Sequence, residues 1–239
     1  MSTPEYYLSR HVHLCLTGDH VVFLDLRRDK YQAIGRAERC ALRNHVAGWP
    51  SCGDLDCGHE ARDSQALLTT LLDHGLLTTD PALGRVVELP TAEPPTNVLI
   101  DDELARQRSI SRRQALRFAL ACAKVAILLR LFRLDRVVDS IARRKRKALA
   151  RGESSTLERD RELVATFNRL RPFAFSANTF CLYDSLALLE FLAMYDSYPC
   201  WIVGVHTSPF AAHSWLQQHG YLFNGPIDQV ARYTPILVV

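Results

Sequence analysis

A cysteine and a histidine in the last third of the chain have the residue types and the setting that acyl-transfer chemistry requires. Cys181 opens the helical pattern CLYDSLALLEFLAMY, and residues 175–179 (FSANT) before it include several N-cap side chains. In the first turn of a helix, the helix dipole and unpaired backbone N–H groups favour the thiolate, which is the nucleophilic form. His213, in FAAHSWLQ, falls at the start of a predicted strand. Such a cysteine beside such a histidine predicts an activated thiol that attacks a carbonyl group.

The imidazole would need a third polar group to fix its orientation, and two downstream residues are candidates. Asn224 follows a predicted hairpin that turns at His219 and Gly220, and Asp228 comes four residues later. An adjacent strand of a tight hairpin would place Asn224 opposite His213, so the spacing slightly favours Asn224 and leaves Asp228 open. The structural alternative for Cys181 is a small core residue, because free cysteines are among the most buried side chains.

Helices and then strands would position these groups. Residues 103–150 are strongly helical with a break near 131–135, and 157–170 and 180–195 follow as two further helices. The strands expected after them cover 201–205, the hairpin 213–223 and 236–239.

The first 88 residues predict a separate small α+β module. Residues 11–16, the β-branched run 20–26 (HVVFLDL) and Lys30–Ile34 have strand patterns, and Ala66–His74 ends the helical patterns that follow. Residues 89–102 contain three prolines and show neither a helical nor a strand period, so we expect a linker there.

Composition excludes several classes of protein. The chain of 239 residues is 48% hydrophobic with a net charge of +3, which argues against disorder, and its most apolar stretch, 115–132, is interrupted by charges that a membrane helix avoids. No secretory signal is visible, and seven cysteines at irregular spacings favour free thiols in a reducing cytosol over a disulfide framework.

No cofactor or metal is expected. Cys52, Cys57 and His59 resemble metal ligands, but no second pair lies nearby, and the phosphate-loop and dinucleotide fingerprints are missing from the sequence. Between residues 130 and 151 the sequence has nine Lys/Arg and only two Asp. They predict either a solvated helix end or a docking surface for an acidic peptide or a nucleic acid, and no RNA-binding or zinc-finger pattern supports the nucleic acid.

A family resemblance covers roughly residues 100–239. The blocks CLYDSLALLEFL, WIVGVHTSPFAAHSWLQ, LFN and YTPILVV resemble the leader peptidases of lasso-peptide maturation, which are cysteine proteases with a transglutaminase-like, papain-related fold. The resemblance implies Cys181 as nucleophile and His213 as base. The family usually has an aspartate directly after the asparagine that Asn224 matches, and this chain has Gly225 there. The resemblance therefore leaves Asn224 and Asp228 both open as the third group.

The N-terminal module, above all VVFLDLRRDKYQAIG, resembles the PqqD-like winged helix that recognises the precursor in the same pathway. In that family the leader peptide adds as a strand to the sheet edge and packs against the last helix. The resemblance implies a peptide-binding set here, namely Lys30, Tyr31, Gln32, Ala33, Ile34, Leu67, Thr70, Leu71 and His74.

The predicted fold class is thus α+β, with a winged-helix-like PqqD-type domain (1–88), a linker (89–102) and a papain/transglutaminase-like cysteine peptidase domain (103–239). The expected function is a cytoplasmic cysteine endopeptidase that binds and removes the leader peptide of a ribosomally made lasso-peptide precursor. By resemblance, its partner is an asparagine-synthetase-like macrolactam synthetase, and neither nucleic acid nor a membrane is expected as a partner. The alternatives are a transglutaminase-type acyl transferase or peptide cyclase, and a non-catalytic adaptor that presents the peptide.

Overall fold

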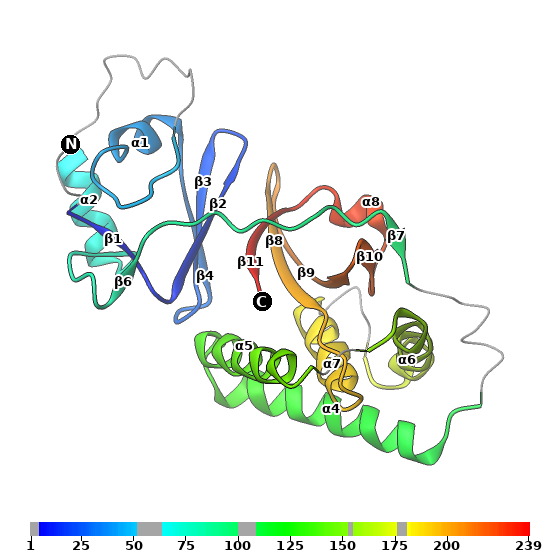
Figure 1. The fold of residues 1–239 in the computed structure, drawn as a ribbon. Coiled ribbons are helices and arrows are strands. Elements are labelled where there is room, and N and C mark those ends of the chain that lie inside the picture. Colours follow the sequence, from blue (N-terminus) through cyan, green and yellow to red (C-terminus); the bar gives the residue numbers. More distant parts are fainter. Residues whose placement is uncertain (1–4, 52–63, 100–108, 153–154, 176–180) are drawn as a thin grey trace. The chain divides into compact units, whose positions relative to one another are not determined.

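The computed structural model describes residues 5–51, 64–99, 109–152, 155–175 and 181–239 (Figure 1). The chain divides into two compact units, each treated by itself below. The first unit comprises Met1–Thr91, Val205–Ala211 and Thr234–Leu237, and the second comprises Ala92–Gly204, Ala212–Tyr233 and Val238–Val239.

The described residues up to Thr91, which make up most of the first unit, form two small antiparallel sheets and two helices. The first sheet has the order β2-β3-β4, and the second has the order β5-β1-β6. The three strands and the last helix predicted for this module are confirmed, because the alternating and helical patterns there are strong. The elements are β1 (Tyr7–Ser9), β2 (Val12–Thr17), β3 (His20–Asp25), β4 (Lys30–Ile34), α1 (Arg36–Ala41), α2 (Ser64–Asp73), β5 (Leu77–Thr78) and β6 (Gly84–Arg85).

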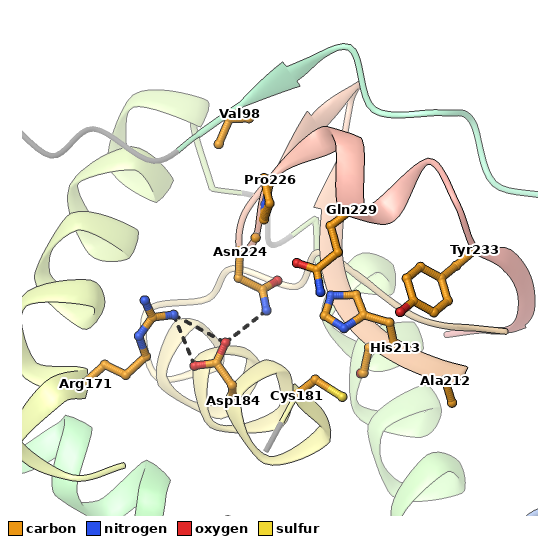
Figure 2. A pocket seen from close by; sticks show the side chains of 12 residues that line it. Val98, Arg171, Cys181, Asp184, Ala212, His213, Asn224, Pro226, Gln229 and Tyr233 are labelled. Atoms are coloured by element: carbon orange, nitrogen blue, oxygen red, sulfur yellow. Dashed lines mark hydrogen bonds and ion pairs between the residues drawn. The ribbon is translucent and has the colours of Figure 1, made fainter. Parts of the chain in front are cut away.

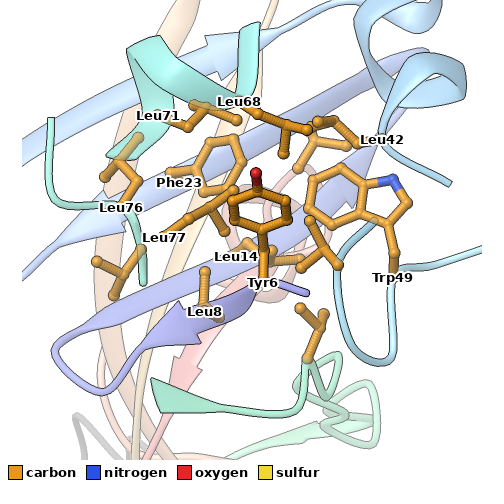
Figure 3. Packing of buried hydrophobic residues seen from close by; sticks show 14 residues of the cluster. Tyr6, Leu8, Leu14, Phe23, Leu42, Trp49, Leu68, Leu71, Leu76 and Leu77 are labelled. Carbon is orange, nitrogen blue, oxygen red and sulfur yellow. The ribbon is translucent and has the colours of Figure 1, made fainter. Parts of the chain in front are cut away.

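The core of this unit joins both sheets to α2. Leu14 and Phe23 project from neighbouring strands toward Leu68 and Leu71 of α2, and Trp49 closes one side (Figure 3). All five are at most 8% exposed. Burial of this apolar surface explains why a module with such short strands can hold its shape.

The second unit builds a mixed sheet with helices beside it. The strand order is β11-β8-β9-β10-β7, in which β9 and β10 form the predicted hairpin around His219 and Gly220, both with positive φ. The elements after β6 are β7 (Asn97–Val98), α4 (Arg112–Leu131), α5 (Leu134–Ala150), α6 (Leu157–Leu170), η1 (Arg171–Phe173), α7 (Cys181–Ala193), β8 (Cys200–Thr207), β9 (Phe210–Gln218), β10 (Tyr221–Leu222), α8 (Ile227–Val230) and β11 (Thr234–Val238). All of them belong to the second unit except the end of β8, the start of β9 and most of β11, which belong to the first. The α+β class is therefore confirmed. No described helix combines the length and the apolar composition needed to cross a bilayer.

One element departs from the expectation for residues 89–102. The expectation that this segment has no strand is wrong at β7, which pairs in parallel with β10, and the Leu99 N–H donates to the Leu222 carbonyl. A two-residue strand is too short to show a period, and its partner lies more than a hundred residues away, so only tertiary structure reveals it.

Helix α7 lies at the centre of the helical layer, beside α4 and α6 (Figure 1). Every residue from Asp184 to Leu192 is buried. The rings of Phe118 (α4), Phe167 (α6) and Phe191 (α7) form a chain with centroid distances of 5.3 and 5.9 Å. This packing fixes the body of α7, and with it the position of the helix's first turn.

A buried carboxylate links α7 to two other helices. Glu190 of α7 accepts a hydrogen bond from Lys124 of α4 (2.6 Å) and two from Arg144 of α5 (2.8 Å each). Burial by itself would raise the pKa of Glu190, but the hydrogen bonds and charges of Arg144 and Lys124 hold that pKa below its ordinary value. Part of the basic run thus has a structural role.

We expect Glu190→Gln to lower the free energy of unfolding by about 2 kcal/mol, because the buried amide can no longer accept all three charged hydrogen bonds from Lys124 and Arg144. Since the pKa of Glu190 is lowered by folding, the wild-type advantage should be full near neutral pH and shrink as the pH falls through that pKa. Urea denaturation at two pH values measures both effects. The control Glu158→Gln, on the exposed first turn of α6, should change stability by less than about 0.5 kcal/mol. Equal stability of Glu190→Gln and wild type would contradict this account.

Candidate active site

One pocket of the second unit, with a volume of about 760 Å³, brings the predicted nucleophile and base together (Figure 2). Cys181, His213 and Asn224 line it, whereas Asp228 lies on α8, exposed and not among the lining residues. The thiol and the imidazole both face the pocket (Figure 2). Its volume is in the range of pockets that hold a small ligand or a peptide side chain.

Cys181 is the first residue of α7 and is half-buried and free. Because the rest of the helix is packed in the core, only this turn opens to the pocket. The predicted N-cap residues at 176–179 lie outside the described residues. The core alternative for Cys181 is therefore not what the structure shows: the thiol lines a pocket at the start of a helix.

A chain of buried hydroxyls sets β9 against the first turns of α7. Trp201 Nε1 donates to Ser214 Oγ (2.7 Å), and Ser214 Oγ lies 2.6 Å from Ser185 Oγ. Ser185 in turn donates to the Leu182 carbonyl (3.1 Å), so Ser214 must be the donor between the two hydroxyls. Ser214 adjoins the histidine and Ser185 lies one turn after Cys181, so this chain fixes the strand and helix that carry the dyad.

Aromatic rings and burial define the surroundings of His213. Its ring centroid lies 5.3 Å from that of Tyr233 and 6.1 Å from that of Trp215, with the Trp215 ring nearly parallel to it. Nε2 is buried and has no hydrogen-bond partner among the described residues. Burial lowers the pKa of His213 below its ordinary value.

Gly225 occupies the position where the resembled family has aspartate. Its φ of +86° is one that side-chain-bearing residues rarely adopt, and a β-carbon built there would lie 3.9 Å from His213 Nε2. A side chain at position 225 would therefore lie next to the unpaired nitrogen. In this chain that position has no side chain.

Asn224 makes its hydrogen bonds away from the histidine. Its Oδ1 accepts from the Leu216 N–H (2.8 Å), and its Nδ2 donates to Asp184 Oδ2 (3.2 Å). The expectation that Asn224 lies opposite His213 is wrong: the hairpin pairs Leu222 with Gln217, and the same register continued puts Asn224 opposite Trp215. The predicted two-residue turn at His219 and Gly220 pairs Gln218 with Tyr221, and this register, counted forward, already excludes His213 as the partner of Asn224.

Asp184 and Arg171 complete the wall next to Asn224. Arg171 lies 3.4 Å from Asp184 Oδ1, and the carboxylate is 4% exposed (Figure 2). Burial raises the pKa of Asp184, and Arg171 and Asn224 only partly oppose that effect. This wall offers a guanidinium group to a bound carbonyl or carboxylate.

Arg171, Gln229 and Tyr233 line the pocket without any signal in the sequence, because Arg171 ends a helix and the other two lie on or after the short helix α8, so only the fold brings them together. Asp184 stands one helical turn after Cys181, a position from which the sequence predicts a side chain facing solvent or a basic partner; it is buried, with Arg171 as its basic partner. Gln229 and Tyr233 lie on the same side of the pocket as His213 (Figure 2).

Metal chemistry finds no support in the part of the chain that the structure describes, where no group of three or more His, Cys, Asp or Glu could hold an ion. The candidate ligands Cys52, Cys57 and His59 lie outside that part. Free thiols are confirmed for Cys15, Cys122, Cys181 and Cys200, but the expectation is wrong for Cys40, which is disulfide-bonded.

The predicted peptide-binding residues lie on β4 and α2 of the first unit. Among the described strands β4 pairs only with β3, so it is an edge strand, and Gln32 Oε1 lies 2.9 Å from His74 Nδ1 just after α2. Lys30, Ala33, Thr70 and His74 are exposed, and Tyr31, Gln32, Ile34 and Leu67 are half-buried. Leu71 is 3% exposed within the hydrophobic core, so it supports the sheet rather than offering a surface.

In a reaction that uses His213 as a base, kcat/KM should fall at low pH as the imidazole becomes protonated. Because burial lowers the pKa of His213, we expect this acidic limb to lie below pH about 6.5, the ordinary pKa of histidine. In Gly225→Asp a carboxylate beside Nε2 should raise that pKa and move the limb upward by about one unit. Gly225→Ala shares the backbone strain without the charge and is the matched control. If the acidic limb of kcat/KM falls at the same pH for Gly225→Asp and Gly225→Ala, the carboxylate does not reach the ring.

Comparison with known proteins assigns the site to a family. Residues 119–238, half of the chain, match the family described as the transglutaminase-like superfamily. No curated protein and no solved structure matches the chain. The matched stretch includes Cys181, His213 and every pocket residue except Val98. It does not include the module that resembles PqqD, so that resemblance stays a prediction.

Proposed function

Because the chain belongs to the transglutaminase-like superfamily, whose papain-like domains are typically catalytic cysteine proteases or acyltransferases, we propose that it is a cysteine endopeptidase that removes the leader of a ribosomally made peptide. One observation carries the proposal: Cys181 at the start of α7 and His213 on β9 line the same pocket. Thiol and imidazole are the two groups that amide-bond cleavage by a cysteine nucleophile needs.

The chemistry follows from these two groups. Neutral His213 takes the thiol proton as the Cys181 sulfur attacks the carbonyl carbon at the leader–core junction. The imidazolium then protonates the leaving amine of the core, the C–N bond breaks, and a thioester links the leader to Cys181. Water, deprotonated by His213, hydrolyses the thioester and releases the leader acid. The Arg171 side of the pocket would receive carbonyl or carboxylate groups of the bound segment.

Recognition of the leader is proposed for the first unit. Strand β4, which among the described strands pairs only with β3, offers its outer edge to an added strand, and the hydrogen-bonded pair Gln32 and His74 places the end of α2 beside it. Holding the leader there would raise the effective concentration of the cleavage site at the pocket. We propose Lys30–Ile34 for the backbone contacts, and Leu67, Thr70 and His74 for the side-chain contacts.

The precursor class is proposed from the resemblance to lasso-peptide leader peptidases. Cleavage would then free the core amine for an asparagine-synthetase-like macrolactam synthetase in the cytoplasm. The domain limits proposed from the sequence, 1–88, 89–102 and 103–239, assign recognition to the first part and cleavage to the last.

Acyl transfer is a second candidate, because the family includes acyltransferases and the two reactions share every step up to the thioester. An amine in place of water would yield a crosslinked or cyclic product. A non-catalytic adaptor is a third candidate, for which the missing side chain at Gly225 is the specific observation.

The three candidate functions can be separated by incubating the purified chain with the precursor peptide encoded beside its gene and measuring the masses of the products. Two fragments whose masses sum to the precursor plus one water indicate hydrolysis. Fragments or cyclic products whose masses sum to the precursor without added water indicate acyl transfer from the cleaved bond to an amine, and loss of ammonia indicates acyl transfer from a side-chain amide; either result would overturn the peptidase proposal. An unchanged precursor that still binds indicates the adaptor.

A further inference from the structure

Helix α4 has apolar side chains on two opposite faces. The inner face, with Phe118, Ala121, Cys122 and Val125, is buried in the second unit. On the outer face Leu116 is 60% exposed, Leu120 52%, Ile127 53% and Leu131 70%. Water-facing sides of helices are usually polar, and a helix that is apolar all round is normally covered on all sides.

The outer residues follow a spacing that suits a second helix. Leu116, Leu120, exposed Ala123, Ile127 and Leu131 stand at i, i+4, i+7, i+11 and i+15. That spacing is the seam of a helix pair, in which large side chains insert between those of the partner. Ala123 in the middle leaves a hole that a large side chain of a partner helix could fill. We call this row the α4 seam.

The charge of the helices around the α4 seam indicates which kind of partner helix would fit it. Residues 112–151 contain 13 Lys/Arg and 2 Asp, a net charge of +11, whereas the remaining residues contain 16 Lys/Arg and 24 Asp/Glu, a net charge of −8. Arg112 and Arg113 stand at one end of the α4 seam and Arg130 at the other, all exposed. A complementary partner is therefore acidic around an apolar stripe.

We propose that the α4 seam docks an acidic amphipathic helix of a partner protein. A second copy of this chain fits less well, because pairing two seams would bring like-charged arginines together at both ends. The regular heptad-like spacing favours a helix over a lipid surface, which sets no spacing requirement. None of the seam residues lines the pocket, so docking would leave Cys181 and His213 unobstructed.

The test uses the whole chain and a labelled synthetic helix with Leu at the a and d positions of its heptads and Glu at e and g. Fluorescence anisotropy should show binding that weakens as salt is raised, and the matched peptide with Lys in place of Glu should not bind. Leu120→Glu should weaken binding at least about tenfold, because it places a carboxylate in the seam. Leu83→Glu, a change of the same type at a residue 64% exposed in the first unit, should bind as wild type does.

Thermal melts of both variants check that folding is intact. The proposal is overturned if the Glu peptide fails to bind, if the Lys peptide binds equally, or if Leu83→Glu weakens binding as much as Leu120→Glu does. It is also overturned if Leu120→Glu abolishes a concentration-dependent dimer seen by sedimentation, which would make a second copy the occupant. If the chain sediments with phosphatidylglycerol vesicles and Leu120→Glu abolishes that co-sedimentation, the occupant of the α4 seam would be an anionic lipid surface instead.

Discussion

Cys181→Ala is expected to abolish cleavage of the precursor, with a loss of about 10⁴-fold or more in kcat, and to leave the affinity for the leader unchanged. The alanine removes the atom that forms the thioester, and no other described cysteine lines the pocket. Leader affinity should persist because β4 and α2 belong to a unit with its own hydrophobic core. Fragment masses measure cleavage, and anisotropy of a labelled leader peptide measures binding.

The matched control is Cys200→Ala, which removes the other half-buried free thiol. Cys200 lies at the start of β8 with its sulfur 3.1 Å from Lys145 Nζ, and it is not among the pocket residues, so full activity is expected. Equal cleavage by wild type and Cys181→Ala would remove the nucleophile from the proposal. Loss of leader binding in Cys181→Ala would show that recognition and chemistry are not separate.

Cys181 and His213, which line the same pocket, could be predicted from the sequence because each lies in a local pattern. Cys181 begins a long apolar helical run after residues that favour N-caps, and His213 lies in an alternating strand before a two-residue turn with Gly. Local patterns of this kind predict where an element starts, and the start of α7 is what places the thiol. The same reasoning found β2, β3, β4 and α2.

The surroundings of the pair could not be read in this way. Arg171, Asp184 and Asn224 meet because a helix end, a helix turn and a loop after β10 converge, and their sequence separations carry no periodic signal. Strand β7 likewise exists only through its pairing with β10. The register of the β9–β10 hairpin, by contrast, follows from its two-residue turn at His219 and Gly220, and that register places Asn224 opposite Trp215 rather than His213.

The same geometry predicts the roles of the two candidate third residues. Asn224→Ala is expected to remove most activity and to lower the free energy of unfolding by about 2 kcal/mol, because the buried Leu216 N–H loses its acceptor and Asp184 loses a donor. Asp228→Ala, at an exposed position outside the pocket, is the control and should change stability by less than about 0.5 kcal/mol. Urea denaturation and kcat/KM measure both, and a larger loss for Asp228→Ala would refute this assignment.

Asn224→Asp separates positioning from simple packing. The new carboxylate can still accept from the Leu216 N–H, but it replaces the donor to Asp184 with a like charge, and burial already raises the pKa of Asp184. The two carboxylates should therefore share a proton, with one pKa raised above its unfolded value, so the variant loses stability as the pH rises through that pKa and regains it at lower pH. If Asn224 acts only by filling space, this nearly isosteric change should leave stability and kcat/KM as in wild type at every pH. A pH-dependent loss of both would place Asn224 as the residue that holds the Asp184 wall of the pocket in position.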